Sequence, residues 1–203
     1  MHSSSNAPPL TIGVLALQGD YASHARALEE IGVGAKMVRK AQELVGIDGL
    51  IIPGGESTTF LKLLAREELF EPLQSFAASR PTFGTCAGCI LLAKQVSGPE
   101  QESLGVLDAS VERNAYGRQI DSEILTKETS LPGGPLEMVF IRAPRILEVG
   151  AEVEVLATRD GFPILVRGRS VLAATFHPEL SEDRRVHRYF LQMVQVQRNS
   201  GTS

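Results

Sequence analysis

The feature that most constrains the fold is a series of short apolar runs in the first half of the chain, each followed by a helical pattern. Residues 11–18, TIGVLALQ, are almost wholly apolar, which is typical of a strand buried on both faces. Residues 47–53 repeat this texture. Strands that alternate with helices favour parallel pairing, with helices on both faces of the sheet. This half of the chain therefore predicts an α/β fold with buried parallel strands.

The second half of the chain is richer in strand patterns. Short apolar or alternating runs are separated by turn signals such as PGG and RDG. We expect strands there at residues 107–112, 136–141, 153–158, 162–167 and 171–176, followed by a helix at 181–196. In the first half we expect strands at residues 11–18, 35–39, 47–53 and 81–85, and helices after residue 20, after an N-cap at Ser57, at 68–78 and from 87 to about 94.

The length of the chain indicates one domain, and its charge pattern limits the possible partners. The 203 residues suit a single domain that buries its own core. We expect residues 11–197 to form it, with residues 1–10 as a disordered leader and 198–203 as a disordered tail. The 24 acidic and 20 basic residues are interspersed, which argues against nucleic-acid binding. No apolar run approaches the roughly 20 residues that cross a bilayer, so we expect a soluble cytoplasmic protein with no membrane contact.

Residues 84–88, GTCAG, place a cysteine where an apolar strand becomes an apolar helix. The pattern Gly-x-nucleophile-x-Gly is typical of a sharp turn that exposes the side chain at its apex. The helix N-terminus there favours a thiolate, and its free N–H groups can bind an oxyanion. The alternative is that Cys86 is a small buried residue. Cys89 is assigned to core packing, since no thioredoxin-like sequence follows to support a redox pair.

A nucleophilic cysteine requires a base and a third group that orients the base. His177 follows the apolar run VLAATF and begins the sequence His-Pro-Glu. Pro178 favours an extended chain at residue 177, so Glu179 points to the same side and reaches the histidine ring. Cys86, His177 and Glu179 therefore form a candidate catalytic triad. The alternative is a histidine that ends a strand and a glutamate that begins a helix.

The remaining residues limit other kinds of site. His24 and His187 have polar neighbours, and we expect both on the solvated surface. No second histidine or cysteine lies at ligand spacing from His177 or Cys86, so no metal site is predicted. No glycine-rich dinucleotide loop or phosphate loop is present, so no cofactor is expected.

Six segments together resemble a known family. They are GVLALQGD, LIIPGGEST, FGTCAG, VERNAYGRQ, FIRAP and FHPE, and the resemblance covers residues 11 to about 196. They are similar to the glutaminase subunits of pyridoxal 5′-phosphate synthases, within the class I glutamine amidotransferase-like proteins. GTCAG with HPE identifies only the broader class, whereas GGEST and RNAYGRQ narrow it to these subunits. The family commonly has leucine where this chain has Cys89.

The resemblance implies a three-layer α/β sandwich with a central mixed, mostly parallel sheet flanked by helices. It also implies hydrolysis of L-glutamine to L-glutamate and ammonia without a cofactor or metal. Cys86 would attack the amide, His177 would transfer protons and Glu179 would orient His177. The implied partner is a synthase subunit, in a large heteromeric complex, that uses the ammonia to build pyridoxal 5′-phosphate (vitamin B6).

The same motifs imply the residues that hold glutamine. The implied glutamine-binding residues are Gly55, Glu56, Ser57, Arg113, Ile141 and Arg142, and the implied oxyanion hole uses the backbone of Gly55 and Ala87. An arginine suits the substrate carboxylate because it donates paired, charge-assisted hydrogen bonds. From the residues alone, ordinary surface charge is the alternative for both arginines, and a tight turn is the alternative for the glycines.

Three other functions are compatible with parts of this pattern. The related glutaminase of histidine biosynthesis also pairs an elbow cysteine with His-Pro-Glu. A non-catalytic module of the same fold could sense oxidation or dock a partner, but it would not need His177 and Glu179. A cysteine peptidase is the third alternative.

Overall fold

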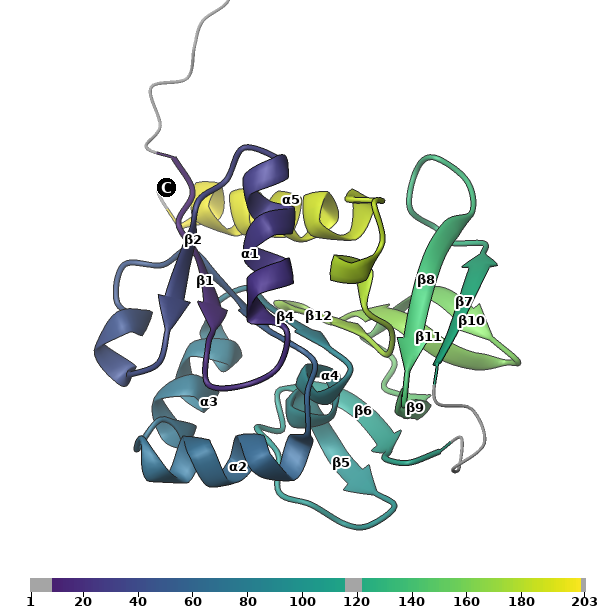
Figure 1. The fold of residues 1–203 in the computed structure, drawn as a ribbon, viewed down its shortest axis with the longest axis horizontal. Coiled ribbons are helices and arrows are strands. Elements are labelled where there is room, and N and C mark those ends of the chain that lie inside the picture. Colours follow the sequence, from purple (N-terminus) through teal and green to yellow (C-terminus); the bar gives the residue numbers. More distant parts are fainter. Residues whose placement is uncertain (1–8, 116–121, 202–203) are drawn as a thin grey trace, which may run out of the picture.

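A seven-stranded sheet runs through the middle of the molecule (Figure 1). The computed structural model describes residues 9–115 and 122–201, so most of the predicted leader and the last two residues of the predicted tail lie outside the described residues. The strand order is β10 (Glu154–Arg159), β11 (Phe162–Arg167), β12 (Val171–Ala174), β4 (Thr82–Thr85), β3 (Gly49–Ile52), β1 (Ile12–Leu15) and β2 (Ala35–Val38). The last five are parallel, and β10 and β11 are antiparallel to their neighbours.

Helices cover both faces of this sheet, as the strand patterns predict. One face carries α1 (Tyr21–Glu30) and α5 (Arg185–Ser200), and the other carries α2 (Ser57–Arg66), α3 (Phe70–Ser79) and α4 (Ala87–Leu92) (Figure 1). Successive residues of a strand point to opposite faces, so Leu50 and Ile52 pack in the core under α2 and α3, whereas Ile51 packs in the core under α1 and α5. The predicted three-layer α/β sandwich around a mixed, mostly parallel sheet is confirmed.

Two small sheets flank the main one. The first contains β5 (Ala93–Ser97), β6 (Leu107–Glu112) and β9 (Arg145–Val149), and the second pairs β7 (Ser122–Lys127) with β8 (Leu136–Ile141). The strands β5, β7 and β9 were not predicted. The helix expected to reach about residue 94 ends at Leu92, because Ala93 has extended backbone angles and pairs with Leu107 of β6.

The last helix lies further along the chain than its apolar stripe suggested. A 3-10 turn, η3 (Pro178–Leu180), precedes it, and Asp183 accepts a hydrogen bond from the backbone N–H of Arg185 at 2.9 Å. The prediction of a disordered tail from residue 198 is wrong for residues 198–200, which are helical. The Ser200 hydroxyl donates to the carbonyl of Val196 at 2.9 Å, and Arg198 pairs with Asp48, so polar contacts extend the helix.

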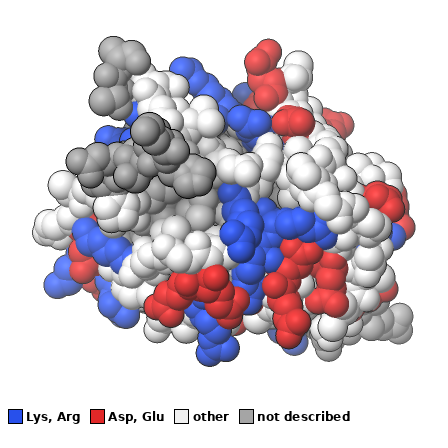
Figure 2. Space-filling view, turned by 90° about the horizontal axis from the view of Figure 1, so that it is seen from above, with Lys and Arg blue, Asp and Glu red and all other residues white. Residues whose placement is uncertain are grey.

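Charges of both signs are interspersed on the surface. Figure 2 shows basic and acidic side chains next to each other on the face seen from above. Arg184, directly before α5, pairs with Glu30 of α1, with 2.6 Å between Nε and Oε2. Among the described residues, no helix is long and apolar enough to span a membrane.

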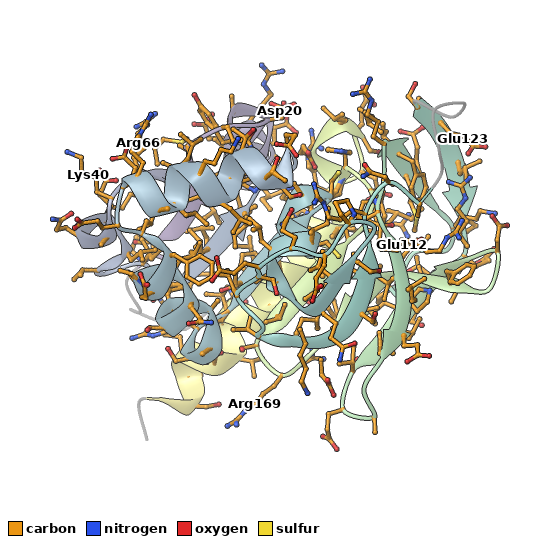
Figure 3. The ribbon with its side chains drawn as sticks, turned by 90° about the horizontal axis from the view of Figure 1, so that it is seen from below. Asp20, Lys40, Arg66, Glu112, Glu123 and Arg169 are labelled. Carbon is orange, nitrogen blue, oxygen red and sulfur yellow. The ribbon has the colours of Figure 1, made fainter. Side chains whose placement is uncertain are left out.

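The carboxyl ends of β1, β3, β4 and β12 lie at one edge of the sheet because these strands are parallel. In Figure 3, Asp20, which follows β1, lies at the opposite end of the molecule from Arg169, which precedes β12. The labelled Glu112 and Glu123 belong to the small sheets, on the side away from Lys40 and Arg66. Ligands of open α/β sheets bind outside the carboxyl ends of the strands, so this edge is where a site is expected.

The packing of α5 yields a stability test. Phe190 is fully buried against the sheet, whereas Val196 on the same helix is exposed. We expect Phe190→Ala to lower the free energy of unfolding by about 3–5 kcal/mol, since it removes a buried ring and leaves a cavity. Val196→Ala should change it by less than about 0.5 kcal/mol. Urea unfolding measures both, and equal effects would contradict the assignment of the helix faces.

Candidate active site

Cys86 stands at the apex of the sharp turn between β4 and α4. Its backbone angles are φ 48° and ψ −104°, which a non-glycine residue rarely adopts. The turn is tight enough that a Cβ on Gly84 would lie 2.6 Å from the carbonyl oxygen of Gly88, and a Cβ on Gly88 would lie 2.2 Å from that of Ile52. Two glycines therefore let the strand and the helix approach each other, as GTCAG predicts. Strain of this kind is found at functional sites.

His177 and Glu179 meet as the sequence predicts. His177 follows β12, and its backbone N–H donates to the carbonyl of Val139 in β8 at 2.8 Å. Its Nδ1 lies 2.7 Å from Oε1 of Glu179. Pro178 begins the 3-10 turn η3 rather than an extended segment, and this turn places the two side chains together. Both are buried.

The side chains of Cys86 and His177 meet over Gly54, at the end of the segment that follows β3. A Cβ on Gly54 would lie 2.4 Å from Cε1 of His177 and 3.3 Å from Cβ of Cys86. Burial by itself lowers the pKa of His177, but hydrogen bonds with Cys86 and Glu179 raise it to about 10. His177 is therefore charged at neutral pH. A positive ring next to the sulfur stabilises a negative charge there, which is the reactive state of a thiol.

The loop after β3 is organised by the Glu56 carboxylate. It accepts hydrogen bonds from the backbone N–H groups of Thr58 at 3.1 Å and Thr59 at 2.7 Å, so Glu56 is the N-cap of α2. The prediction of Ser57 as the N-cap is wrong by one residue, because the longer glutamate side chain reaches back to these donors. The Ser57 hydroxyl is buried and donates to Gln101 at 2.9 Å.

Gln18 braces the same loop and was not predicted. Its side-chain amide donates to the carbonyl of Glu56 at 2.8 Å and accepts from the backbone N–H of Glu56 at 3.4 Å. A Cβ on Gly55, which has φ 150°, would lie 2.8 Å from Nε2 of Gln18, so glycine is required there. The position of Gln18, at the carboxyl end of the first buried strand, is the signal that could have found it.

The remaining predicted glutamine-binding residues, Arg113, Ile141 and Arg142, lie at the ends of strands in the two small sheets. Arg113, directly after β6, is nearly buried, and its Nη2 lies 3.6 Å from Oε1 of Glu56. Ile141 ends β8, and its carbonyl oxygen lies 3.8 Å from Sγ of Cys86. Arg142 follows with φ 43° and an exposed side chain. Gly54, His177 and Ile141 thus lie next to Cys86. Arg113 lies next to Glu56 in the loop that contains Gly54.

Two histidine predictions are wrong. His24 and His187 are fully buried, although their polar neighbours suggested a surface position. Their spacing from apolar residues was the better signal, because Leu28 lies one turn from His24 and Phe190 lies about one turn from His187, on the buried faces of α1 and α5. The prediction that Cys89 packs in the core is confirmed, and burial raises the pKa of its thiol.

Within residues 9–115 and 122–201, no three His, Cys, Asp or Glu side chains are grouped to hold a metal ion. Cys86 and Cys89 are both free thiols.

Comparison with known proteins identifies the family. A model of the SNO glutamine amidotransferase family matches residues 14–196. This chain belongs to that family. The match begins within β1 and ends within α5, and it therefore includes Cys86, His177 and Glu179.

Individual proteins are similar to this chain over nearly their whole length. The pyridoxal 5′-phosphate synthase subunit PdxT of Koribacter versatilis is 63% identical over 185 residues, which cover 91% of this chain and 96% of the relative. The protein of the same name from Solibacter usitatus is 52% identical over 189 residues, covering 90% and 98%. A solved glutamine amidotransferase structure superposes with a TM-score of 0.85 at 49% identity, covering 91% of this chain and 98% of the other.

The contact over Gly54 can be tested by one added methyl group. Gly54→Ala should displace the His177 ring and lower glutaminase kcat at least about 100-fold, since small misplacements of reacting groups cost that much. The matched control is Gly34→Ala, because a Cβ at Gly34 meets no atom within 4 Å among the described residues. Steady-state kinetics measure both, and a Gly54→Ala enzyme as active as Gly34→Ala would contradict this geometry.

The Glu56 cap predicts a pH dependence of stability. Burial alone would raise the pKa of Glu56, but hydrogen bonds from Thr58 and Thr59 lower it to about 2. A carboxylate with a depressed pKa stabilises the fold above its ordinary pKa of 4.5, and this contribution is lost as the pH falls through about 2. Glu56→Gln should therefore destabilise the protein at pH 7, and the difference from wild type should shrink below about pH 4.5.

Denaturant unfolding between about pH 7 and pH 2.5 measures this difference. Glu152→Gln, at an exposed position before β10, is the control. A Glu56→Gln difference that is the same at every pH would contradict the capping role.

Proposed function

We propose that this chain hydrolyses L-glutamine to L-glutamate and ammonia, with Cys86 as nucleophile, His177 as acid and base, and Glu179 as the group that orients His177. The observation that carries the proposal is the cysteine at a strained helix N-terminus in contact with a buried histidine that is bonded to Glu179. Membership of the SNO glutamine amidotransferase family supports it. The amide of glutamine is the bond that such a pair would cleave.

The proposed reaction has two halves. The Cys86 sulfur attacks the amide carbon, a C–S bond forms, and the carbonyl electron pair moves onto oxygen. We assign the oxyanion to the backbone N–H groups of Gly55 and Ala87. The oxyanion collapses, the C–N bond breaks, and His177 gives its proton to the leaving nitrogen. Water then loses a proton to His177 and attacks the thioester, and the C–S bond breaks to release glutamate.

Glutamine has an α-carboxylate and an α-ammonium that the site must match. We assign the carboxylate to the guanidinium groups of Arg113 and Arg142, which can donate paired hydrogen bonds. Arg113 already lies 3.6 Å from the Glu56 carboxylate, so one charge of each sign is present at the loop after β3. We assign contacts with the substrate to Ile141 and to the backbone of Ser57, since the Ser57 hydroxyl is bonded to Gln101.

The ammonia requires an acceptor, because free ammonia is mostly protonated at neutral pH and is then not a nucleophile. The relatives at 52% and 63% identity are subunits of pyridoxal 5′-phosphate synthase. We propose that this chain delivers ammonia to a synthase subunit for vitamin B6 synthesis, in a large heteromeric complex in the cytoplasm. The names of these relatives favour a synthase subunit as the acceptor of ammonia over an acceptor in histidine biosynthesis.

The test is release of ammonia from glutamine labelled with ¹⁵N in the side-chain amide, with the synthase subunit present. Cys86→Ala should lower the rate at least about 1,000-fold, as loss of a nucleophile does. Cys89→Ala is the matched control, since that thiol is fully buried in the core, and it should keep most of the activity. Ammonia release by the Cys86→Ala protein at the wild-type rate would disprove the nucleophile.

The acceptor is tested in the same reaction. The ¹⁵N label should appear in pyridoxal 5′-phosphate when the synthase subunit and its sugar phosphates are added. Label that remains in free ammonia despite an active synthase would contradict the proposed delivery.

A further inference from the structure

Two buried histidines lie behind the triad, on the side of Glu179 away from His177. His24 of α1 and His187 of α5 are both 0% exposed. Nε2 of His24 lies 3.3 Å from Oε2 of Glu179, and Nδ1 of His24 lies 3.1 Å from Nε2 of His187. The contacts therefore run without a break from α5 through α1 to the oxygen of Glu179 that His177 does not use.

The Glu179 carboxylate needs a hydrogen-bond donor for its second oxygen, Oε2. Its Oε1 is bonded to His177 at 2.7 Å, but its Oε2 makes no well-aligned hydrogen bond within the described part of the chain. Glu179 is almost fully buried, and a buried carboxylate oxygen without a donor is costly. The ring of His24 lies 3.3 Å from that oxygen and can donate to it.

The order of groups determines where the protons lie. Because a carboxylate only accepts hydrogen bonds, we assign a proton to Nε2 of His24, which lies 3.3 Å from Oε2 of Glu179 and 3.1 Å from the Thr85 hydroxyl oxygen. In a neutral ring, Nδ1 of His24 then has no proton and accepts from Nε2–H of His187. The remaining nitrogen, Nδ1 of His187, is left as an unpaired buried acceptor, and it has no partner among the described residues.

The surroundings favour neutral rings. Burial lowers the pKa of His24 and outweighs the opposing effects of Glu179 and Asp20, while His177 lowers it further. Burial likewise lowers the pKa of His187. The charged group that faces His187 from outside the pair is Arg184, which acts in the same direction.

Apolar packing keeps the pair in place. The ring of Phe83 in β4 packs edge-on against both histidines, with ring centroids 6.1 Å and 6.0 Å away. This contact excludes water that could otherwise compete for the Glu179 oxygen. It also holds the two rings at the strand that leads into Cys86.

We propose that His24 is a positioning residue for the glutaminase reaction, which holds the free oxygen of Glu179, and that His187 fixes the tautomer of His24 that can donate to it. The inference rests on the proposed function. Without the donor, Glu179 would turn away or take up a proton, and His177 would lose its oriented, charged state. The reaction would then slow without a change in the groups that hold glutamine.

The test compares His24→Leu, which removes the donor, with His24→Gln, whose amide nitrogen reaches the place of Nε2. We expect His24→Leu to lower kcat about 10–100-fold, as loss of an orienting partner does, with KM within about twofold. The acid limb of the pH profile of kcat/KM should move to higher pH, because Glu179 then protonates more readily. His24→Gln should return kcat to within about threefold of wild type. His187→Leu should have a smaller effect in the same direction.

Leu28→Ala, on the buried face of the same helix, is the control for lost packing. It should lower the thermal midpoint without moving the acid limb. The assay uses the chain together with the synthase subunit.

The inference is overturned if His24→Leu keeps the wild-type kcat and acid limb, or if it behaves as Leu28→Ala does. Should His24→Leu fail to fold, His24→Asn replaces it, since its shorter amide reaches the place of Nδ1 and cannot serve Glu179. Equal kcat for His24→Asn and His24→Gln would then overturn the inference. Ammonia release by Cys86→Ala would instead refute the proposed function, so the two failures are distinguishable.

Discussion

The close contact between Cys86 and His177 is the constraint on which the rest of the structure depends. The two residues are about ninety positions apart in the chain, and they meet because β4 and β12 are adjacent parallel strands that end at the same edge. The pairing of Ala174 with Thr85 places the next residues of both strands side by side. Sheet register therefore brings the ends of the two strands together. The strained turn at Cys86 and the backbone bond from His177 to Val139 then position the nucleophile and its base, which suits a reaction that tolerates little misplacement.

Glycine makes this contact possible from three directions. Gly84 and Gly88 allow the backbone to turn sharply enough to present the sulfur, and Gly54 leaves the space that the His177 ring occupies. The charge of His177 then depends on groups further from the substrate. Glu179 holds one ring nitrogen, and His24 and His187 lie behind Glu179. Strand β4, which leads into Cys86, thus also packs against His24 and His187 through Phe83.

Much of this arrangement could be predicted from the sequence, because the signals were local. The apolar runs predicted the buried parallel strands, and the small residues around Cys86 predicted the sharp turn. His177 and Glu179 could be paired because only one residue separates them. The roles of the triad residues and the contacts with glutamine stay predictions, because the arrangement of the side chains does not by itself demonstrate a reaction.

Other features depend on contacts between distant segments and could not be predicted. The burial of His24 and His187 arises from the packing of α1 against α5, which neither segment reveals by itself. The strand β7 alternates only weakly and is set by its partner β8. The N-cap at Glu56 follows from the reach of one side chain, and Ser57 was the equally reasonable choice from residue preferences.

The most direct test of the account is the charge of His177, followed by the ¹⁵N chemical shifts of its ring in the intact protein. We expect both ring nitrogens to stay protonated at neutral pH and the ring to titrate near pH 10, and we expect Cys86→Ala to lower this value. A ring that is neutral at pH 7, or one whose titration does not respond to Cys86→Ala, would contradict the contact between the two residues.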